Sequence, residues 1–263
     1  MNDVVKKQLE KIEKKEKKYL SKKENRLYCK KKAVEEMIEQ KVPEKVKQAI
    51  EKAFFKGFLV LLEKGTSVIE KTYDKEKILW QHQFYENRFE QNRKNRQFQK
   101  IVKNANQCNR INIAITAVEG GVLGVLGIGL PDIPLFLAII LKGIYQTALQ
   151  YGFDYNDKRE QIYILRLIRA AMIEQKQKVA LNILVEETAM CIEKEIAVPY
   201  NFEEEVKQTS QLLSHAMLTA KMIQGVPVIG VAGSGYNAVV YHTILKYCNI
   251  KYKKRYLQKK NKE

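Results

Sequence analysis

Apolar residues recur at helical rather than alternating spacing through most of the chain. From Val46 onward the apolar positions fall three and four residues apart, and the pattern returns over residues 159–174, 179–197 and 203–224. Such spacing is typical of amphipathic helices packed on a core. No run alternates between apolar and polar residues, as a half-buried strand would. The pattern therefore predicts an all-α helical bundle.

Two adjoining stretches are apolar on every side. Residues 111–130 contain one charge, Glu119, and residues 133–151 contain one, Lys142. A helix of about 19 residues spans roughly 28 Å at ~1.5 Å per residue. That length approaches the ~30 Å hydrocarbon core of a bilayer, and it is also the length of an ordinary buried helix. The composition leaves two alternatives open, insertion into a membrane or a soluble core.

The run Pro131-Asp132-Ile133-Pro134 separates the two stretches and predicts the turn of a helical hairpin. As the N-cap, Asp132 accepts backbone N–H groups that the second arm leaves unpaired. Pro134 falls in the first helical turn, where its missing N–H costs nothing. A ligand-binding role for Asp132 is the alternative. A second glycine-rich hairpin is predicted over residues 203–245, with Gly225-Val226-Pro227 as its interruption.

Glycines in the first arm recur on one helical side, at Gly120, Gly124 and Gly127. Glycine costs about 1 kcal/mol against alanine inside a helix, so these positions need a packing reason. Close approach of a second helix supplies one. A phosphate-binding loop is excluded, because no preceding strand and no Lys-Ser/Thr pair accompanies the glycines.

Glu119 is a carboxylate in an apolar segment, where it must be paired or protonated. In an antiparallel hairpin, Glu119 and Lys142 lie at similar heights, so we expect an ion pair between them. Arg166 and Arg169 are the rival partners.

The net charge of +17 is unevenly distributed. The basic excess lies in residues 1–110 and 246–263, around a slightly acidic centre. We therefore divide the chain into a long, charged N-terminal helical extension (1–42), a helical domain (43–250) and a basic tail (251–263). Basic ends favour an anionic partner, whether membrane surface, nucleic acid or acidic protein. Solubilising termini are the alternative.

The basic tail combines cations with tyrosines, as membrane-interface anchors do. Its candidate lipid-surface residues are Lys251, Lys253, Lys254 and Arg255. Nucleic acid is disfavoured, since no recognised binding motif accompanies these residues. Further aromatic residues at positions 80, 84, 85, 89 and 98 stand among basic residues, where base stacking is one interpretation. One helical face packed on the core explains them more simply.

The inventory for catalysis and metal binding is thin. His82, His215 and His242 are scattered, and the four cysteines lie far apart without metal-ligand spacing. We expect no metal, no cofactor and no catalytic residue, and reduced thiols in a cytoplasmic protein. The N-terminal residues lack the apolar run of a secretory signal.

Several motifs together resemble the EcsC family. They are Leu62-Glu-Lys-Gly-Thr66, Ile69-Glu-Lys-Thr-Tyr73, the run from Asn112 through Glu119-Gly120-Gly121, Pro131–Pro134, Ile144 through Tyr151-Gly152-Phe153-Asp154, and Gly225 through Ala238. The likeness covers roughly residues 45–250. It implies a bacterial helical protein without an assigned activity. It also implies an association with a membrane system, because the founding member is encoded beside the subunits of the Ecs ABC transporter. The family supplies no catalytic residues, and Glu119, Asp132, Pro134, Tyr151, Gly152 and Asp154 are marked only as motif positions.

Three functional hypotheses follow. The first is a non-enzymatic protein at the cytoplasmic face of the membrane, bound to anionic lipid or to a transport complex such as ABC transporter subunits. The second is a soluble helical adaptor whose glycine-rich helices form its core. The third is an enzyme with an unrecognised site near Glu119 and Asp132, which would need a carboxylate of perturbed pKa.

Overall fold

The computed structural model describes residues 3–21, 35–92, 96–103, 132–223 and 234–262, and every regular element in these ranges is helical. The all-α prediction is confirmed for this part of the chain. The elements are α1 (Asp3–Leu20), α3 (Glu44–Val60), the π-helical turn η1 (Leu61–Gly65), α4 (Thr66–Glu70), α5 (Lys75–Asn92), α7 (Asp132–Gln150), α8 (Lys158–Met172), α9 (Gln175–Glu193), α10 (Phe202–Ile223) and α11 (Ser234–Lys262). Residues 35–41 and 96–103 are also helical.

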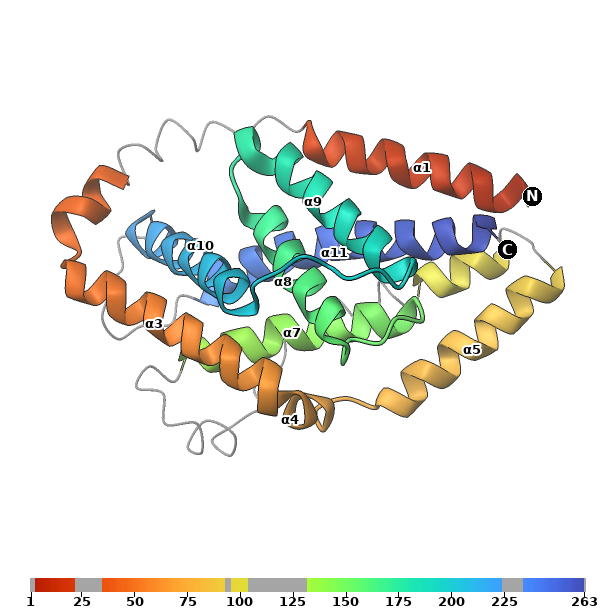
Figure 1. Ribbon diagram of the computed structural model, residues 1–263, viewed down its shortest axis with the longest axis horizontal. Helices are drawn as coiled ribbons and strands as arrows, with labels where there is room; N and C mark the ends of the chain where they lie inside the picture. The colour runs from red at the N-terminus through yellow and green to blue at the C-terminus, as the bar shows by residue number, and fades with distance from the viewer. Residues whose placement is uncertain (1–2, 22–34, 93–95, 104–131, 224–233, 263) are drawn as a thin grey trace.

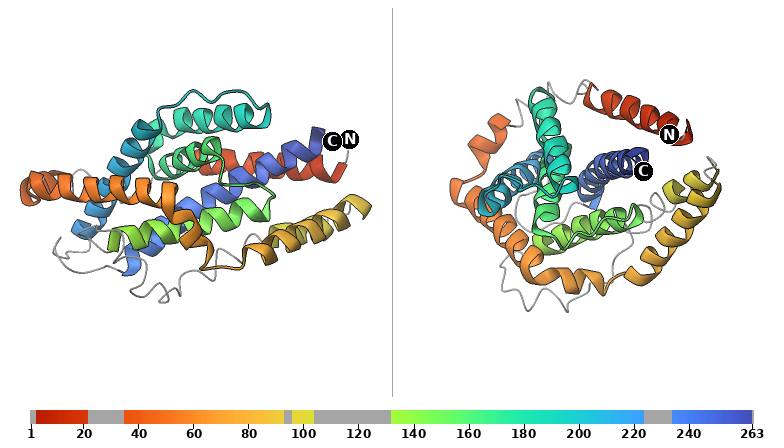
Figure 2. Two further views of the ribbon diagram at one scale, coloured as in Figure 1. Left: turned by 60° about the horizontal axis from the view of Figure 1, so that its bottom comes forward. Right: turned by 45° about the vertical axis from the view of Figure 1, so that its right-hand side comes forward.

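The long C-terminal helix α11 is the centre of the bundle (Figure 1). It packs against α7 on one side and α8 on another, and α1 lies along it. Helices α3 and α5 contact α7, while α9 and α10 contact α8. Figure 2 shows α1, α3 and α5 at the periphery around α7 and α11. This arrangement brings the N-terminal and C-terminal helices together.

Helix α7 is the apolar core helix. Leu137, Ile140, Leu141 and Ile144 are fully buried. Among the described residues, Ile133–Gln150 is the one stretch with the length and composition to cross a membrane, and 83% of it is buried inside the protein. The expected first arm, residues 111–130 with Glu119, Gly120, Gly124 and Gly127, lies outside the described residues. The hairpin itself therefore stays a prediction.

A glycine does allow close helix packing, at Gly143 on α7. A Cβ built there would lie 2.6 Å from Leu245 Cδ1 and 2.7 Å from the Tyr241 hydroxyl, both on α11. Real Cβ atoms do not approach so closely, and a well-packed interior has little room to yield. Gly143 thus sets how near α7 and α11 can lie.

The two basic ends of the chain are packed rather than free. On α1, Val5 and Ile12 are buried. Residues 251–262, expected as a separate tail, instead continue α11 without a break. Tyr247, Tyr252 and Leu257 on α11 are fully buried. The lysine-rich composition concealed this packing, because each helix buries a narrow apolar face beneath its cations.

The aromatic residues between 80 and 98 do not share one core face. Phe89 and Phe98 are buried, as predicted, but Trp80 is 61% exposed and Phe84 is 38% exposed. Trp80 and Phe89 are nine residues apart on α5, which places them on opposite sides of the helix. The prediction of a core position is therefore wrong for Trp80 and Phe84.

Candidate functional site

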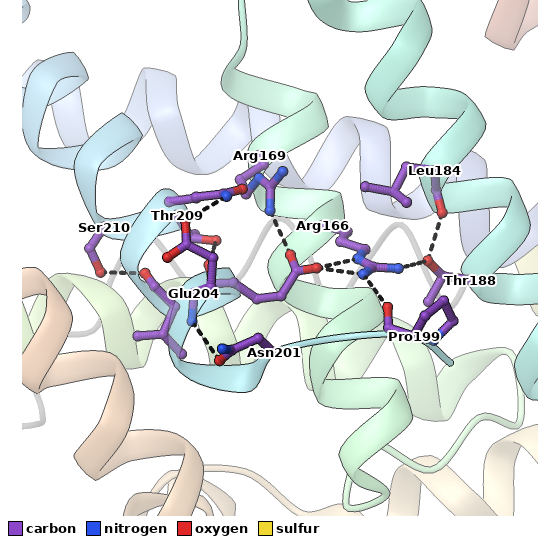
Figure 3. Close-up of polar contacts among 12 residues, drawn as sticks. Arg166, Arg169, Leu184, Thr188, Pro199, Asn201, Glu204, Thr209 and Ser210 are labelled. Carbon is purple, nitrogen blue, oxygen red and sulfur yellow. Dashed lines mark hydrogen bonds and ion pairs between the residues drawn. The ribbon is translucent and has the colours of Figure 1, made fainter. Parts of the chain in front are cut away.

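A buried carboxylate, Glu205 on α10, binds two arginines of α8. These arginines, Arg166 and Arg169, are labelled in Figure 3. Arg166 donates to Glu205 Oε1 from Nε at 2.7 Å and from Nη2 at 2.5 Å. Arg169 donates from Nη1 to Glu205 Oε2 at 2.5 Å. The remaining Arg166 contacts go to Thr188 Oγ1 on α9, at 2.7 Å, and to the Pro199 carbonyl, at 3.1 Å.

This cluster links α8, α9 and α10 and the segment between α9 and α10. Every nitrogen of the Arg166 guanidinium donates to a protein oxygen. Burial lowers the pKa of Arg169, and the Glu205 carboxylate acts in the opposite direction. Because two arginines share one carboxylate and every nitrogen of the Arg166 guanidinium has an acceptor, the geometry favours a structural clamp over a ligand site.

The expected partner for these arginines, Glu119, lies outside the described residues. The structure pairs Arg166 and Arg169 with Glu205 instead. Lys142, the leading candidate, is 7% exposed and donates from Nζ to the Thr72 carbonyl at 2.8 Å. Burial lowers the pKa of Lys142. The Glu119–Lys142 ion pair stays a prediction.

A double-mutant cycle tests that ion pair. We expect Glu119→Gln and Lys142→Met to show a coupling free energy of about 1 kcal/mol or more, since contacting charged groups are not additive. Urea denaturation of the two single variants and the double variant gives the value. Additive losses would show that Lys142 is held by the Thr72 carbonyl alone.

Two of the motif positions shape the start of α7. The helix begins at Asp132 and Pro134 lies in its first turn, as the sequence predicts. The Asp132 side chain is not among those described, so its capping role stays a prediction.

Three more motif positions end α7. Phe153 N donates to the Ala148 carbonyl, and Gly152 N donates to the Leu149 carbonyl, both at 3.0 Å. This pair of bonds is a Schellman C-cap, which needs a left-handed residue at Gly152. Gly152 has that conformation, with φ of 77°.

The same turn joins three helices. The Tyr151 hydroxyl donates to Asn249 Oδ1 on α11 at 3.0 Å. His82 on α5 lies against Gly152, and its Nδ1 is 3.0 Å from the Gln150 carbonyl oxygen. Asp154 Oδ1 accepts from the backbone N of Asn156 at 3.0 Å. Burial lowers the pKa of His82, which favours the neutral imidazole. Through these contacts the motif residues hold the end of α7 against α5 and α11.

A polar cluster that the sequence analysis did not identify lies where α4 meets the turn after α7. The Tyr155 hydroxyl donates to Glu70 Oε1 at 2.5 Å and lies 2.6 Å from the Tyr73 hydroxyl. Lys75 Nζ donates to the same Glu70 oxygen at 2.6 Å, and the Tyr145 ring stacks on Tyr155 at 4.0 Å. The sequence feature that could have identified this cluster is the motif Ile69–Tyr73, which supplies two of its residues, Glu70 and Tyr73.

The electrostatics of this cluster do not activate a nucleophile. Burial, then Glu70, raises the pKa of Tyr155 far above its ordinary value. Burial also acts against ionisation of Glu70, but Lys75 and Tyr155 outweigh it and lower the Glu70 pKa. The result is an ionised carboxylate held by neutral hydroxyls, which stabilises the packing of α4 on the turn.

Two of the cations assigned to a lipid surface are instead bound by carboxylates. Lys251 is 1% exposed and donates to Glu16 Oε1 on α1 at 2.5 Å. It also pairs with Glu186 on α9. Lys254 donates to Glu16 Oε2 at 2.6 Å. The Glu16 pKa is lowered because Lys251 and Lys254 outweigh the opposing effect of burial.

Arg255 is likewise interior, at 3% exposed. Its Nη1 donates to both oxygens of Glu160, at 2.8 and 3.1 Å, and its Nη2 donates to Glu193 at 3.0 Å. Lys253 differs from the others: it is half-buried with its Nζ 5.0 Å from the centre of the Phe98 ring. Lys251 and Arg255 therefore do not face lipid as expected from the sequence. Both are buried in ion pairs with carboxylates of other helices.

An exposed surface on α5 carries aromatic and cationic groups together. Trp80 and Phe84 stack at 5.2 Å with 14° between their planes, and the Arg88 guanidinium carbon lies 5.2 Å from the Phe84 ring centre. Lys77 lies on the same side by helical spacing. We call Lys77, Trp80, Phe84 and Arg88 the aromatic–cation face. Exposed aromatic rings beside cations suit the interface between water and lipid headgroups.

Among the residues that the structure describes, no group of three or more His, Cys, Asp or Glu side chains is arranged to hold a metal ion. Of the two described cysteines, Cys248 is buried and Cys191 is partly exposed, and both are free thiols. Burial raises the pKa of the Cys248 thiol.

The model of the EcsC protein family matches residues 6–257. That range begins within α1, so it includes the lysine-rich helix that the sequence analysis left outside the likeness. No curated protein and no solved structure matches the chain.

Proposed function

The chain belongs to the EcsC family, and from that premise we propose that it is a non-enzymatic, membrane-associated protein that binds anionic lipid at the cytoplasmic face of a bacterial membrane. The observation that carries the proposal is the aromatic–cation face of α5. A tryptophan that is 61% exposed is unusual on a water-facing helix, since large apolar rings are normally covered.

The geometry of this face suits adsorption at a headgroup layer. Tryptophan is enriched in that region, and phenylalanine is typical of the apolar face of interfacial helices. Lys77 and Arg88 lie beside the two rings to meet lipid phosphates. The net charge of +17 adds long-range attraction to an anionic surface. Each cation near the surface contributes about 1 kcal/mol.

The burial of α7 favours a peripheral mode. Crossing a bilayer would require α7 to leave its contacts with α3, α5 and α11, and 83% of its apolar stretch is already covered by protein. The proposal therefore places the lipid contact on α5, with α7 kept as the core. Release by high salt is the expected behaviour of such a protein.

Trp80 makes the proposal directly testable, because it is the only tryptophan in the chain. We expect its fluorescence emission to shift to shorter wavelength when vesicles containing phosphatidylglycerol are added. Lipids brominated near the headgroup should quench it. Neutral phosphatidylcholine vesicles should produce a much smaller change at the same lipid concentration.

The matched variants separate the face from general hydrophobicity. Fully burying a large apolar side chain contributes about 1.5–3 kcal/mol, and about 1.4 kcal/mol is a factor of ten. Phe84→Ala with Arg88→Gln should therefore weaken vesicle binding roughly tenfold or more in co-sedimentation. Ile183→Ala, at a residue of α9 that is 53% exposed, is the control and should bind as the unmodified chain does. An unshifted Trp80 emission with anionic vesicles would overturn the proposal.

A second candidate is a soluble helical adaptor for a protein partner such as a transport complex. It is supported by the buried α7 and by an exposed apolar stripe on α9. Val179, Ile183 and Met190 are 53–54% exposed and lie on one side of the helix by their spacing. Loss of partner binding in Ile183→Ala, with unchanged vesicle binding, would favour this candidate.

The described residues do not support the enzyme hypothesis. Arg166 and Arg169, the rival partners for Glu119, are paired with Glu205. Neither Glu119 nor the Asp132 side chain is among the described groups. We therefore propose no reaction.

A further inference from the structure

The two sides of the contact between α1 and α11 differ in how their lysines are paired. On the flank toward α9, Lys251 and Lys254 are neutralised by Glu16 and Glu186. On the other flank lie Lys11 and Lys15 of α1 and Lys246 and Lys253 of α11. We call these four residues the lysine flank.

Helical geometry places each pair of the lysine flank on one side of its helix. Lys11 and Lys15 are four residues apart, and Lys246 and Lys253 are seven apart, spacings that return to the same face. The helices run antiparallel, since Tyr19 stacks on Tyr247 while Glu16 contacts Lys251 and Lys254. The two lysine pairs therefore lie on the same side of the contact between α1 and α11.

The four ammonium groups act on one another. Lys15 and Lys11 both repel the Lys253 ammonium, and Lys246 repels that of Lys15. Within the described part of the chain, none of the four forms an ion pair with a carboxylate, in contrast to Lys251 and Lys254 on the opposite flank. Repulsion between neighbouring cations is unfavourable, and a bound anion would relieve it.

Lys253 is held in place rather than free to swing into solvent. Its stem is half-buried, and its Nζ lies 5.0 Å from the centre of the Phe98 ring. A cation–π contact fixes the ammonium without neutralising it. Burial, then Lys15 and Lys11, lowers the Lys253 pKa to about 8. Partial burial, and then the charge of Lys246, lower the pKa of Lys15 as well.

We propose that the lysine flank is a binding site for a phosphate group, which lies along the contact between α1 and α11 and is held by Lys11, Lys15, Lys246 and Lys253. Lysine ammonium groups are established phosphate ligands that act as point charges. Two or three negative oxygens would replace the missing carboxylates on this flank. The site rests on the proposed function in one respect: at a membrane, the phosphate is that of a lipid headgroup.

The first arm of the test uses the full chain in solution without lipid. Inorganic phosphate and pyrophosphate are compared with chloride at equal ionic strength, and the melting temperature is measured. We expect a dose-dependent rise with phosphate and a larger rise with pyrophosphate, because binding to the folded state stabilises it. A rise no larger than that produced by chloride would overturn the site.

The chain offers a closely matched control. Lys15→Gln with Lys253→Gln removes two charges from the flank, whereas Lys17→Gln with Lys259→Gln removes two exposed charges from the same two helices, away from it. The flank variant should lose the phosphate response by tenfold or more in apparent affinity. Without phosphate it should melt at or above the temperature of the unmodified chain, because repulsion is relieved. The control variant should keep the response, and equal loss in both variants would show nonspecific screening.

The second arm separates a lipid headgroup from free phosphate. Co-sedimentation is measured with vesicles containing phosphatidic acid, whose phosphate is terminal, and with phosphatidylglycerol at equal surface charge. A lipid source predicts preference for phosphatidic acid, lost in the flank variant and kept in the control variant. A free-phosphate source predicts a melting shift with no such preference. If phosphate does not raise the melting temperature through the lysine flank but the Trp80 emission still shifts with anionic vesicles, the site is wrong and the proposed function stands. The reverse result overturns the proposed function and leaves the site.

Discussion

Replacing Glu205 by alanine should lower the free energy of unfolding by about 3–5 kcal/mol, because it leaves two buried arginines without an anion. Arg166 is 4% exposed and Arg169 is also largely covered, so water cannot fully solvate them in place of the carboxylate. The Thr188 and Pro199 acceptors alone do not match the charge. Urea denaturation with an unchanged m-value measures the loss.

Glu204 is the matched control for this prediction. It is the preceding residue on α10, it is exposed, and its side chain accepts only from Gln208 on the same helix. Glu204→Ala should therefore change stability by about 0.5 kcal/mol or less. Equal effects of the two alanine substitutions would show that the clamp does not hold α8 to α10.

A compensating variant separates charge from packing. Methionine at positions 166, 169 and 205 together removes all three charges while keeping side-chain volume. Buried ion pairs replaced in this way are often no less stable. We expect Arg166→Met/Arg169→Met/Glu205→Met to recover much of the stability lost in Glu205→Ala. No recovery would mean that the contacts to Thr188 and Pro199 carry the effect.

Gly152→Ala should be the second most damaging change, at about 2–5 kcal/mol. A left-handed backbone costs a residue with a Cβ about 1–2 kcal/mol. Overpacking adds about 1–3 kcal/mol, because the new Cβ would lie 2.5 Å from His82 Nε2. The imidazole would have to move and would lose its contact with the Gln150 carbonyl.

The two causes are separable in a double-mutant cycle. In the background of His82→Ala the collision is absent, so Gly152→Ala should there cost only the backbone term. An equal cost in both backgrounds would show that His82 yields freely. Both free energies come from the same denaturation experiment.

Glu195 supplies a control of opposite sign. It occupies the equivalent left-handed position at the end of α9, with φ of 56°, and Ile196 N donates to the Cys191 carbonyl at 2.9 Å. Glu195 is exposed and carries a Cβ there already. Glu195→Gly should stabilise the protein by about 1 kcal/mol, since glycine suits this C-cap. Destabilisation would contradict the account of both turns.

Local sequence patterns were enough to predict several of the helices and the end of α7. The spacing of apolar residues in α8, α9 and α10 and the Gly152 stop after α7 act within a few turns of the chain. The motif positions Tyr151, Gly152 and Asp154 were also recognisable, although their structural role needed the partners His82 and Asn249.

Long-range electrostatics could not be predicted in the same way. The sequence around a lysine does not show whether its side chain faces water or a carboxylate. Lys251, for example, binds Glu16, which is 235 residues away in the chain. The exposure of Trp80 was equally hidden, because helical spacing shows which residues share a face without showing what covers that face. The Arg166–Glu205 pair follows from the crossing of α8 and α10, which no local pattern encodes.

The contact between α1 and α11 has a consequence for synthesis on the ribosome. Helix α1 is translated before α11, on which it docks, so the face of α1 that carries Val5, Ile12 and Glu16 lacks its contacts with α11 until that helix has been made. Contacts of such sequence separation slow folding. A nascent chain arrested before α11 is complete would present α1 as a loose amphipathic helix, available to chaperones, proteases or a nearby bilayer.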